Sequence, residues 1–173
     1  MTGKGTQNIK TRRLVHAGLI FALALVLTIV ENTIPSLPLP VPGVKFGLSN
    51  IAVMYAMIFL SKGQAYSIAI LKAMFVFMTR GLIAGILSLS GGILSLTVML
   101  VILIIFRDKI SYMVLSISGA VAHNLGQFAV ITVIYTGLYM WAYLPVLLVS
   151  GVVAGIITAT LLRFIIPALK KLG

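Results

Sequence analysis

The strongest constraint on the fold is a series of apolar runs, each about 15 to 25 residues long, that follow one another along the chain. The runs do not alternate with a period of two, so they predict helices and exclude the strands of a membrane barrel. Of 173 residues, 61% are hydrophobic and 9% are charged, whereas soluble domains carry about 25% charged residues. The sequence therefore predicts an all-α integral membrane protein.

The runs predict a six-transmembrane-helix bundle, and the segments between them predict loops. A single transmembrane domain is expected over residues 14–173, after a frayed, basic cytoplasmic tail at 1–13. The prolines between 35 and 42 exclude a helix there and predict a stiff outer loop. The Gly- and Ser-rich stretch at 81–92 predicts a second outer loop. The expected helices span 14–30, 48–60, 64–80, 93–106, 111–135 and 145–164.

The net charge of +11 suggests nucleic acid at first sight, but the positions of the charges argue for a membrane. No basic stripe interleaved with aromatic residues is present, so nucleic acid is not an expected partner. Only Lys45 and Arg80 fall in the expected outer segments, and this bias predicts that both termini lie in the cytoplasm of a bacterial cell. The basic residues of the inner segments are Lys4, Lys10, Arg12, Arg13, Lys62, Arg107, Lys109, Arg163, Lys170 and Lys171.

Polar side chains placed at mid-depth are the most informative residues. His123, Asn124 and Gln127 lie halfway along the run at 111–135, and Lys72 lies near the middle of the helix expected at 64–80. A charge at the centre of a bilayer costs about 2.5 to 3.5 kcal/mol on insertion scales, so such residues usually face a partner or a cavity. Helical spacing predicts that the three residues near 123 project to one side.

These residues predict one outward-facing, net basic cavity roofed by the two outer loops. Such a cavity favours a small anionic or carbonyl-rich ligand. A simpler interpretation is that Lys72 and the polar trio only hydrogen-bond the bundle together, and Glu31 fits a surface helix end as well as a site. The expected substrate-binding residues are Glu31, Asn32, Lys45, Asn50, Lys72, Arg80, His123, Asn124 and Gln127.

Catalysis and metal binding are not predicted. The chain has two acidic residues, two histidines and no cysteine, so it cannot supply the paired Asp-rich motifs that hold Mg²⁺ for diphosphate chemistry, and it offers no thiolate site. His16 is expected at the inner interface. No phosphate-cradling lysine loop is present. We therefore expect no enzyme and no cofactor, and uphill transport would draw on partner subunits or an ion gradient.

The first helix carries small residues that allow another helix to approach. Gly18 and Ala22 form a small-xxx-small pair, and Ala17 flanks it. Two interpretations are open: packing within the bundle, or docking to a separate membrane subunit.

Two motifs resemble a known family. The run Pro-Val-Pro-Gly-Val-Lys-Phe-Gly-Leu-Ser-Asn-Ile at 40–51 and the run Ala-His-Asn-Leu-Gly-Gln at 122–127 resemble the heptaprenyl diphosphate synthase component I family, also called the Gx transporter family. That family looks like the substrate-binding S components of energy-coupling factor (ECF) transporters.

The resemblance implies capture of a vitamin-like or isoprenoid- or quinone-related solute at the outer face. It also implies docking on a transmembrane T component driven by two ATPases, with Ala17, Gly18 and Ala22 as the contact. The acidic diphosphate motif that the synthase label suggests is not in the chain. The rival interpretations are a non-catalytic membrane subunit that assists a prenyl diphosphate synthase, and a stand-alone secondary transporter that would have to dimerise.

Overall fold

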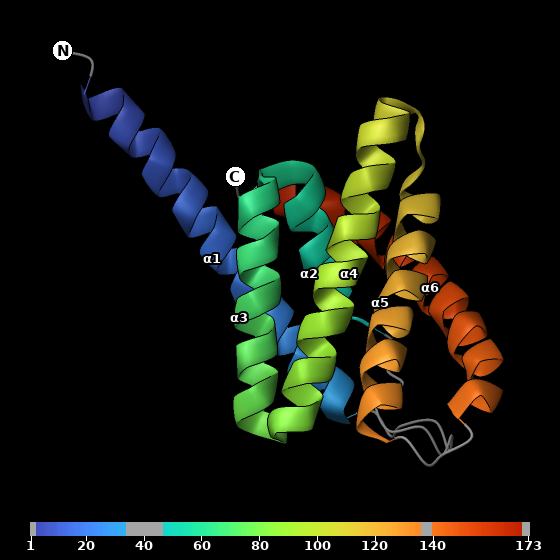
Figure 1. Ribbon diagram of the computed structural model, residues 1–173. Coiled ribbons are helices and arrows are strands. Elements are labelled where there is room, and N and C mark those ends of the chain that lie inside the picture. Colours follow the sequence, from blue (N-terminus) through green and yellow to red (C-terminus); the bar gives the residue numbers. More distant parts are fainter. Residues whose placement is uncertain (1–2, 34–46, 136–139, 171–173) are drawn as a thin grey trace.

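The computed structural model describes residues 3–33, 47–135 and 140–170, except for the side chains of 3–10, 108, 140 and 168–170. Every element described is helical (Figure 1). The elements in chain order are α1 (Gly3–Thr33), α2 (Asn50–Tyr55), η1 (Ala56–Leu60), α3 (Lys62–Arg80), α4 (Leu82–Phe106), η2 (Arg107–Lys109), α5 (Tyr112–Ile134), η3 (Met140–Tyr143) and α6 (Leu144–Lys170).

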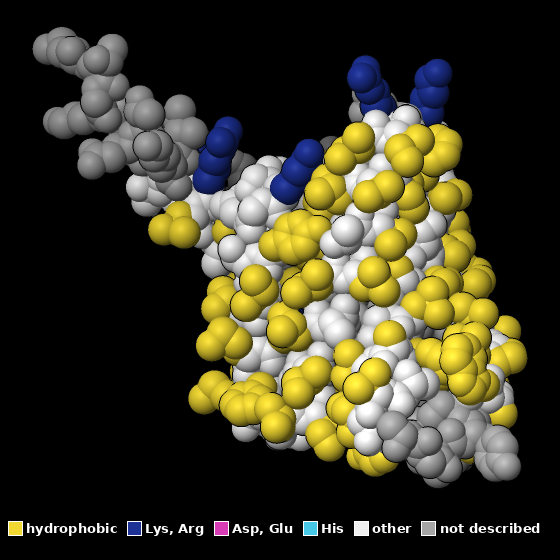
Figure 2. Space-filling view, in the orientation of Figure 1, with side chains coloured by type: hydrophobic (Ala, Val, Ile, Leu, Met, Phe, Trp, Pro, Cys, Tyr) yellow, Lys and Arg dark blue, Asp and Glu magenta, His cyan; other side chains and the backbone are white. Residues whose placement is uncertain are grey.

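Four of the described helical segments are long and apolar enough to cross a membrane: Thr11–Thr33, Leu82–Phe106, Tyr112–Ile134 and Trp141–Pro167. Large apolar side chains cover the flanks of the molecule (Figure 2), as expected for a surface that faces lipid. The all-helical membrane class is thus confirmed. The count of six spans and the cytoplasmic position of both termini stay predictions.

The centre of the bundle is the short apolar helix formed by α2 and η1. Its residues 51–57 are all buried, and they form the core together with residues of α1, α3, α4, α5 and α6. A helix that is apolar on every side belongs in an interior, which explains why residues 51–57 lie at the centre. Around it, α3 packs on α4, α4 on α5 and α5 on α6, while α1 closes the side near α3 (Figure 1).

The helix ends follow from local chemistry. Ser61 caps α3 and Ser111 caps α5, each by accepting a hydrogen bond from the backbone N–H three residues later. Gly81 separates α3 from α4 because its φ of 89° is a conformation that glycine adopts at little cost. The backbone of 3–13 is helical, so the prediction of a frayed tail there is wrong from residue 3 onward.

The predicted outer loop at 81–92 is also wrong, because from Leu82 onward these residues form the first part of α4. Their glycines allow close packing instead of a turn. A Cβ on Gly85 would lie 2.6 Å from the Cβ of Phe77, and a Cβ on Gly91 would lie 2.8 Å from the His123 ring. Small residues at helix contacts are typical of membrane bundles, and a helix satisfies the backbone groups that a loop would leave open in lipid.

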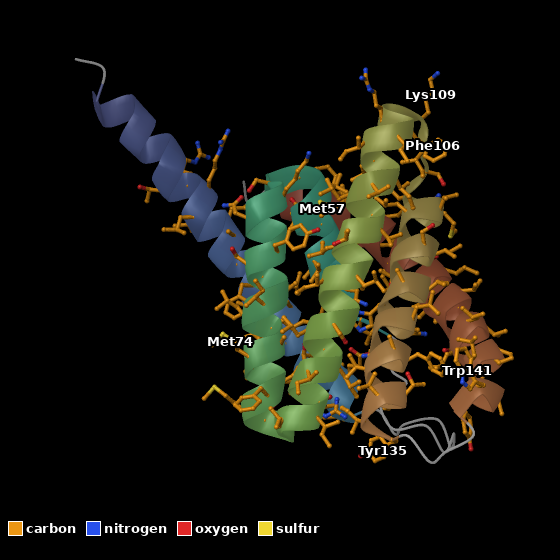
Figure 3. The ribbon with its side chains drawn as sticks, in the orientation of Figure 1. Met57, Met74, Phe106, Lys109, Tyr135 and Trp141 are labelled. Carbon is orange, nitrogen blue, oxygen red and sulfur yellow. The ribbon has the colours of Figure 1, made fainter. Side chains whose placement is uncertain are left out.

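The two ends of the bundle differ in character. Lys and Arg side chains gather at the end where α1 begins and α6 ends (Figures 1 and 2). Lys109 lies at that end, and Tyr135 and Trp141 lie toward the other (Figure 3). Trp141 is 72% exposed and meets Phe128 edge to face with the ring centroids 5.5 Å apart. We call these the basic end and the aromatic end.

Candidate functional site

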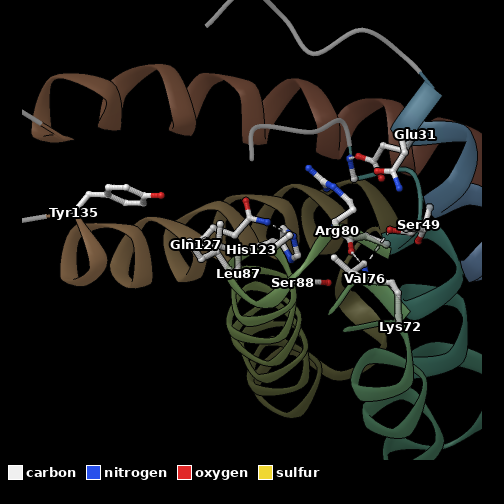
Figure 4. Close-up of a pocket in the computed structure, with 16 residues that line it drawn as sticks. Glu31, Ser49, Lys72, Val76, Arg80, Leu87, Ser88, His123, Gln127 and Tyr135 are labelled. Atoms are coloured by element: carbon white, nitrogen blue, oxygen red, sulfur yellow. Dashed lines mark hydrogen bonds between the residues drawn. The ribbon is translucent and has the colours of Figure 1, made fainter. Parts of the chain in front are cut away.

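A cavity of about 290 Å³ opens among α1, α3, α4, α5 and the segment that leads into α2. Glu31, Ser49, Lys72 and Arg80 gather on one side of it, His123 and Gln127 occupy the middle, and Tyr135 lies at the far end (Figure 4). At about 30 Å³ per water molecule, the volume equals roughly ten waters, which suits a small ligand. Apolar side chains complete the lining: Val76, Ile83, Ala84 and Leu87.

Lys72 is the central charge of the cavity. Its side chain is 3% exposed, and Nζ donates hydrogen bonds to Ser49 Oγ at 3.0 Å and to Asn50 Oδ1 at 3.1 Å. Both acceptors are neutral and come from the N-terminal end of α2. Glu31 also interacts electrostatically with Lys72. The ammonium group is therefore oriented by dipoles and only partly compensated by an opposite charge.

Glu31 is part of the cavity and not a surface residue. It is 5% exposed, and its Oε1 accepts a hydrogen bond from the backbone N–H of Gly47. This contact ties the C-terminal end of α1 to the entry of α2. The described lining residues include two cations, Lys72 and Arg80, and this one carboxylate, so the cavity is net basic.

His123 and Gln127 form the polar wall contributed by α5. Gln127 Nε2 and His123 Nε2 lie 3.1 Å apart and share a hydrogen bond. His123 is 8% exposed, and its ring is held against α4 where Gly91 leaves room for it. The pair therefore presents a fixed polar edge between the charged side of the cavity and Tyr135 at its far end.

Seven of the nine predicted site residues line this one cavity: Glu31, Asn32, Asn50, Lys72, Arg80, His123 and Gln127. Lys45 and the proline-rich loop lie outside the described residues. Asn124 corrects the prediction that the polar trio shares one side. Its Nδ2 donates to Leu147 O at 2.8 Å and to Ser150 Oγ at 3.2 Å, both on α6.

Sequence reasoning did not assign Thr28, Ser49, Ser88 and Tyr135 to the site, although all four line it. Thr28 has a signal, because it precedes Glu31 by three residues and so shares its helix face. Ser49 follows from the need of a buried ammonium group for acceptors. Ser88 was not assigned to the site because it falls within the loop predicted at 81–92.

The small-xxx-small pair of α1 does not pack inside the described bundle. Gly18 and Ala22 are exposed, Ala17 is partly exposed, and a Cβ added to Gly18 would meet nothing within 4 Å. The comparable pair on α6 is buried, because a Cβ on Gly155 would lie 2.5 Å from Ile117 Cα and one on Gly151 would lie 3.1 Å from Val121 Cα. Packing within the bundle thus accounts for the α6 pair and not for the α1 pair.

A comparison with protein families matches residues 20–165 to the family described as heptaprenyl diphosphate synthase component I. No curated protein and no solved structure matched the chain. The matched region runs from the first membrane-compatible helix to the last and contains all the described residues that line the cavity. The chain, a membrane protein by its helices, therefore belongs to the heptaprenyl diphosphate synthase component I family.

Proposed function

We propose that the chain is the substrate-binding S component of an ECF-type uptake transporter, without catalytic activity of its own. It captures a small, anionic or carbonyl-rich solute at the outer face of the cell membrane, in the cavity around Lys72. The observation that carries this proposal is a buried ammonium group, with two neutral acceptors, facing a cavity that is net basic among its described lining residues.

Different parts of the cavity would contact different chemical groups of the ligand. Lys72 and Arg80 supply positive charge for a carboxylate or phosphate, and charge-assisted hydrogen bonds of this type are about twice as strong as neutral ones. His123 and Gln127 suit a carbonyl or hydroxyl group, and Leu87, Val76 and Tyr135 suit an apolar portion. A vitamin-like molecule, or a polar compound related to isoprenoids or quinones, has this combination of groups.

Docking on a T component driven by two ATPases is supported by the exposed face of α1. Gly18 and Ala22 leave a shallow path along the helix, flanked by Leu14 at 71% exposure and Val26 at 55%. Helices in lipid associate by close backbone approach over small residues. An apolar surface with this relief fits a membrane helix of a partner better than it fits lipid chains.

A second candidate is a non-catalytic membrane subunit that assists a prenyl diphosphate synthase. The description of the family favours it, since that description names a component of a synthase. In that case the cavity would hold part of a prenyl compound, and the partner would be a soluble enzyme instead of an energising module.

Purification of the full-length protein from native membranes in a mild detergent separates the two candidates. Mass spectrometry of an organic extract identifies any retained small molecule, and proteomics identifies the partners. A retained small polar anion together with a membrane subunit and ATPases supports uptake. Recovery of a soluble prenyl synthase, with no ATPase and no retained solute, contradicts it and supports the second candidate.

A further inference from the structure

A second cleft opens near the basic end of the bundle, remote from the cavity around Lys72. It has a volume of about 650 Å³ and lies where α1 passes η1 and the start of α3. Its lining shares no residue with the first cavity. The proposed uptake function makes no use of it.

The inner wall of this cleft is aromatic. Tyr55 and Phe59 lie with their ring centroids 4.8 Å apart, and the His16 ring stacks on Tyr55 at 5.9 Å. Leu60 extends the apolar surface. Tyr55 belongs to the buried core and is 2% exposed, so the wall is rigid. Such a surface suits the apolar part of a ligand.

The rim of the cleft is polar and already ordered. Gln64 Nε2 donates to the backbone oxygen of Arg13 at 3.4 Å, and Ser61 Oγ donates to Gln64 Oε1 at 3.1 Å. These contacts join α1 to the start of α3 and place the exposed Arg13 side chain at the rim.

The charged side chains at the cleft are all positive. The chain contains only two acidic residues, Glu31 and Asp108, and neither lines this cleft. Glu31 belongs to the other cavity. Arg13 therefore has no carboxylate among the lining residues, and the exposed Lys62 adds a further positive charge next to Ser61. A guanidinium group above an apolar wall matches an anion that is attached to an apolar body.

We propose that this cleft binds a phosphate-bearing amphiphile, with the phosphate at Arg13 and the adjoining apolar part against Phe59 and Leu60, which the buried Tyr55 backs. A phosphate is favoured over a neutral polar group because the planar guanidinium donates paired hydrogen bonds to it. The position near the basic end fits an anionic phospholipid of the surrounding leaflet. A soluble phosphate compound has the same chemistry and is distinguished by the experiment.

The test uses the full-length protein in a neutral detergent, titrated with dioleoylphosphatidylglycerol or dioleoylphosphatidylcholine, and native mass spectrometry counts the bound lipid. We expect the anionic lipid to bind at least about fivefold more tightly, and Arg13→Gln to remove that preference, since the charge-assisted contacts are lost. Arg163→Gln is the matched control, because Arg163 is exposed and does not line the cleft. Equal binding of the two lipids, or equal loss in both variants, overturns the proposal.

Inorganic phosphate forms the second arm. If phosphate alone binds the wild type, fails to bind Arg13→Gln and displaces the anionic lipid, the phosphate source is a soluble compound. If phosphate alone neither binds the wild type nor displaces the lipid, the source is the bilayer. Should Arg13→Gln fail to fold, a photoactivatable phosphatidylglycerol is applied to the wild-type protein in vesicles. Label on residues 13–16 and 55–64 supports the proposal, whereas label elsewhere, or a protein cross-linked at this cleft, overturns it.

Discussion

Lys72 illustrates how one residue can serve structure and recognition at the same time. Its hydrogen bonds to Ser49 and Asn50 join α3 to the start of α2, as expected if it only stabilises the bundle. Moving an ion from water into the protein interior costs several kcal/mol, and hydrogen bonds to neutral acceptors recover only part of that cost. The adjoining cavity gives the remaining charge a use, because an anionic ligand would complete its compensation.

Lys72→Met tests this assignment. We expect at least about a tenfold loss of the co-purified small molecule, because a hydrogen bond to a charged group contributes about 1.5 to 3 kcal/mol. The unfolding temperature in detergent should change little, since the variant also removes the cost of burying a charge and leaves Ser49 and Asn50 facing the cavity. The retained molecule is quantified by mass spectrometry.

Lys62→Met is the control for this variant, because Lys62 is exposed and does not line the cavity. It should retain the molecule at the wild-type level. A Lys72→Met protein that unfolds while Lys62→Met stays folded would show that Lys72 is purely structural.

Asn124 and Gln127 form a matched pair on α5. Asn124→Ala removes two hydrogen bonds to α6, and hydrogen bonds between membrane helices contribute on average about 0.6 kcal/mol each. We expect a lower unfolding temperature with the ligand retained. Gln127→Ala removes a lining residue, so we expect the reverse pattern. Both are measured by thermal unfolding and by ligand content, and the opposite assignment of effects would place the site on the α6 side of α5.

At the scale of the elements, the α5–α6 contact is closely packed at a glycine. Gly155 lies against the backbone of Ile117, and Ser116 Oγ donates to the Gly155 carbonyl at 2.8 Å. Gly155→Ala should therefore push the helices apart and destabilise the fold by about 1 to 3 kcal/mol. The free energy of unfolding in mixed micelles measures the effect.

Gly18→Ala is the comparison for that variant. It meets open space and replaces a poor helix former by a good one, so stability should stay equal or rise by up to about 1 kcal/mol. Equal destabilisation by the two substitutions would show that Gly18 also packs within the fold.

The exposed face of α1 has its own prediction. Gly18→Leu should abolish recovery of a membrane partner and ATPases, because a large side chain prevents close approach of another helix. Folding and ligand retention should match the wild type, since the added atoms project from an exposed position. Affinity purification with quantitative proteomics measures the partners, and unchanged recovery would exclude this face as the docking surface.

At the scale of the whole molecule, the charge distribution predicts its orientation. The basic end should face the cytoplasm, which places the cavity around Lys72 toward the outside. The chain has no cysteine, so single cysteines report directly. Thr33→Cys at the end of α1 should react with an impermeant maleimide on intact cells, whereas Lys109→Cys should react only after permeabilisation. Mass-tag gel shifts measure the reaction, and the reverse pattern would turn the cavity inward.

The sequence by itself determined the helical membrane class, a short helix that ends at residue 60 and the burial of Lys72. These properties depend on the length and hydropathy of local segments, and each can be counted along the chain. It also selected seven residues that meet in one cavity, because a costly polar group within an apolar run indicates a polar surrounding at that depth.

Only the tertiary structure decided what the glycines do and which way each polar residue faces. Gly91 and Gly155 contact neighbouring helices whereas Gly18 meets open space, although all three look alike in a run of apolar residues. Asn124 turned out to face α6 because the rotation of α5 about its axis is set by packing on α4 and α6. That rotation depends on contacts between segments far apart in the chain, and no local pattern encodes it.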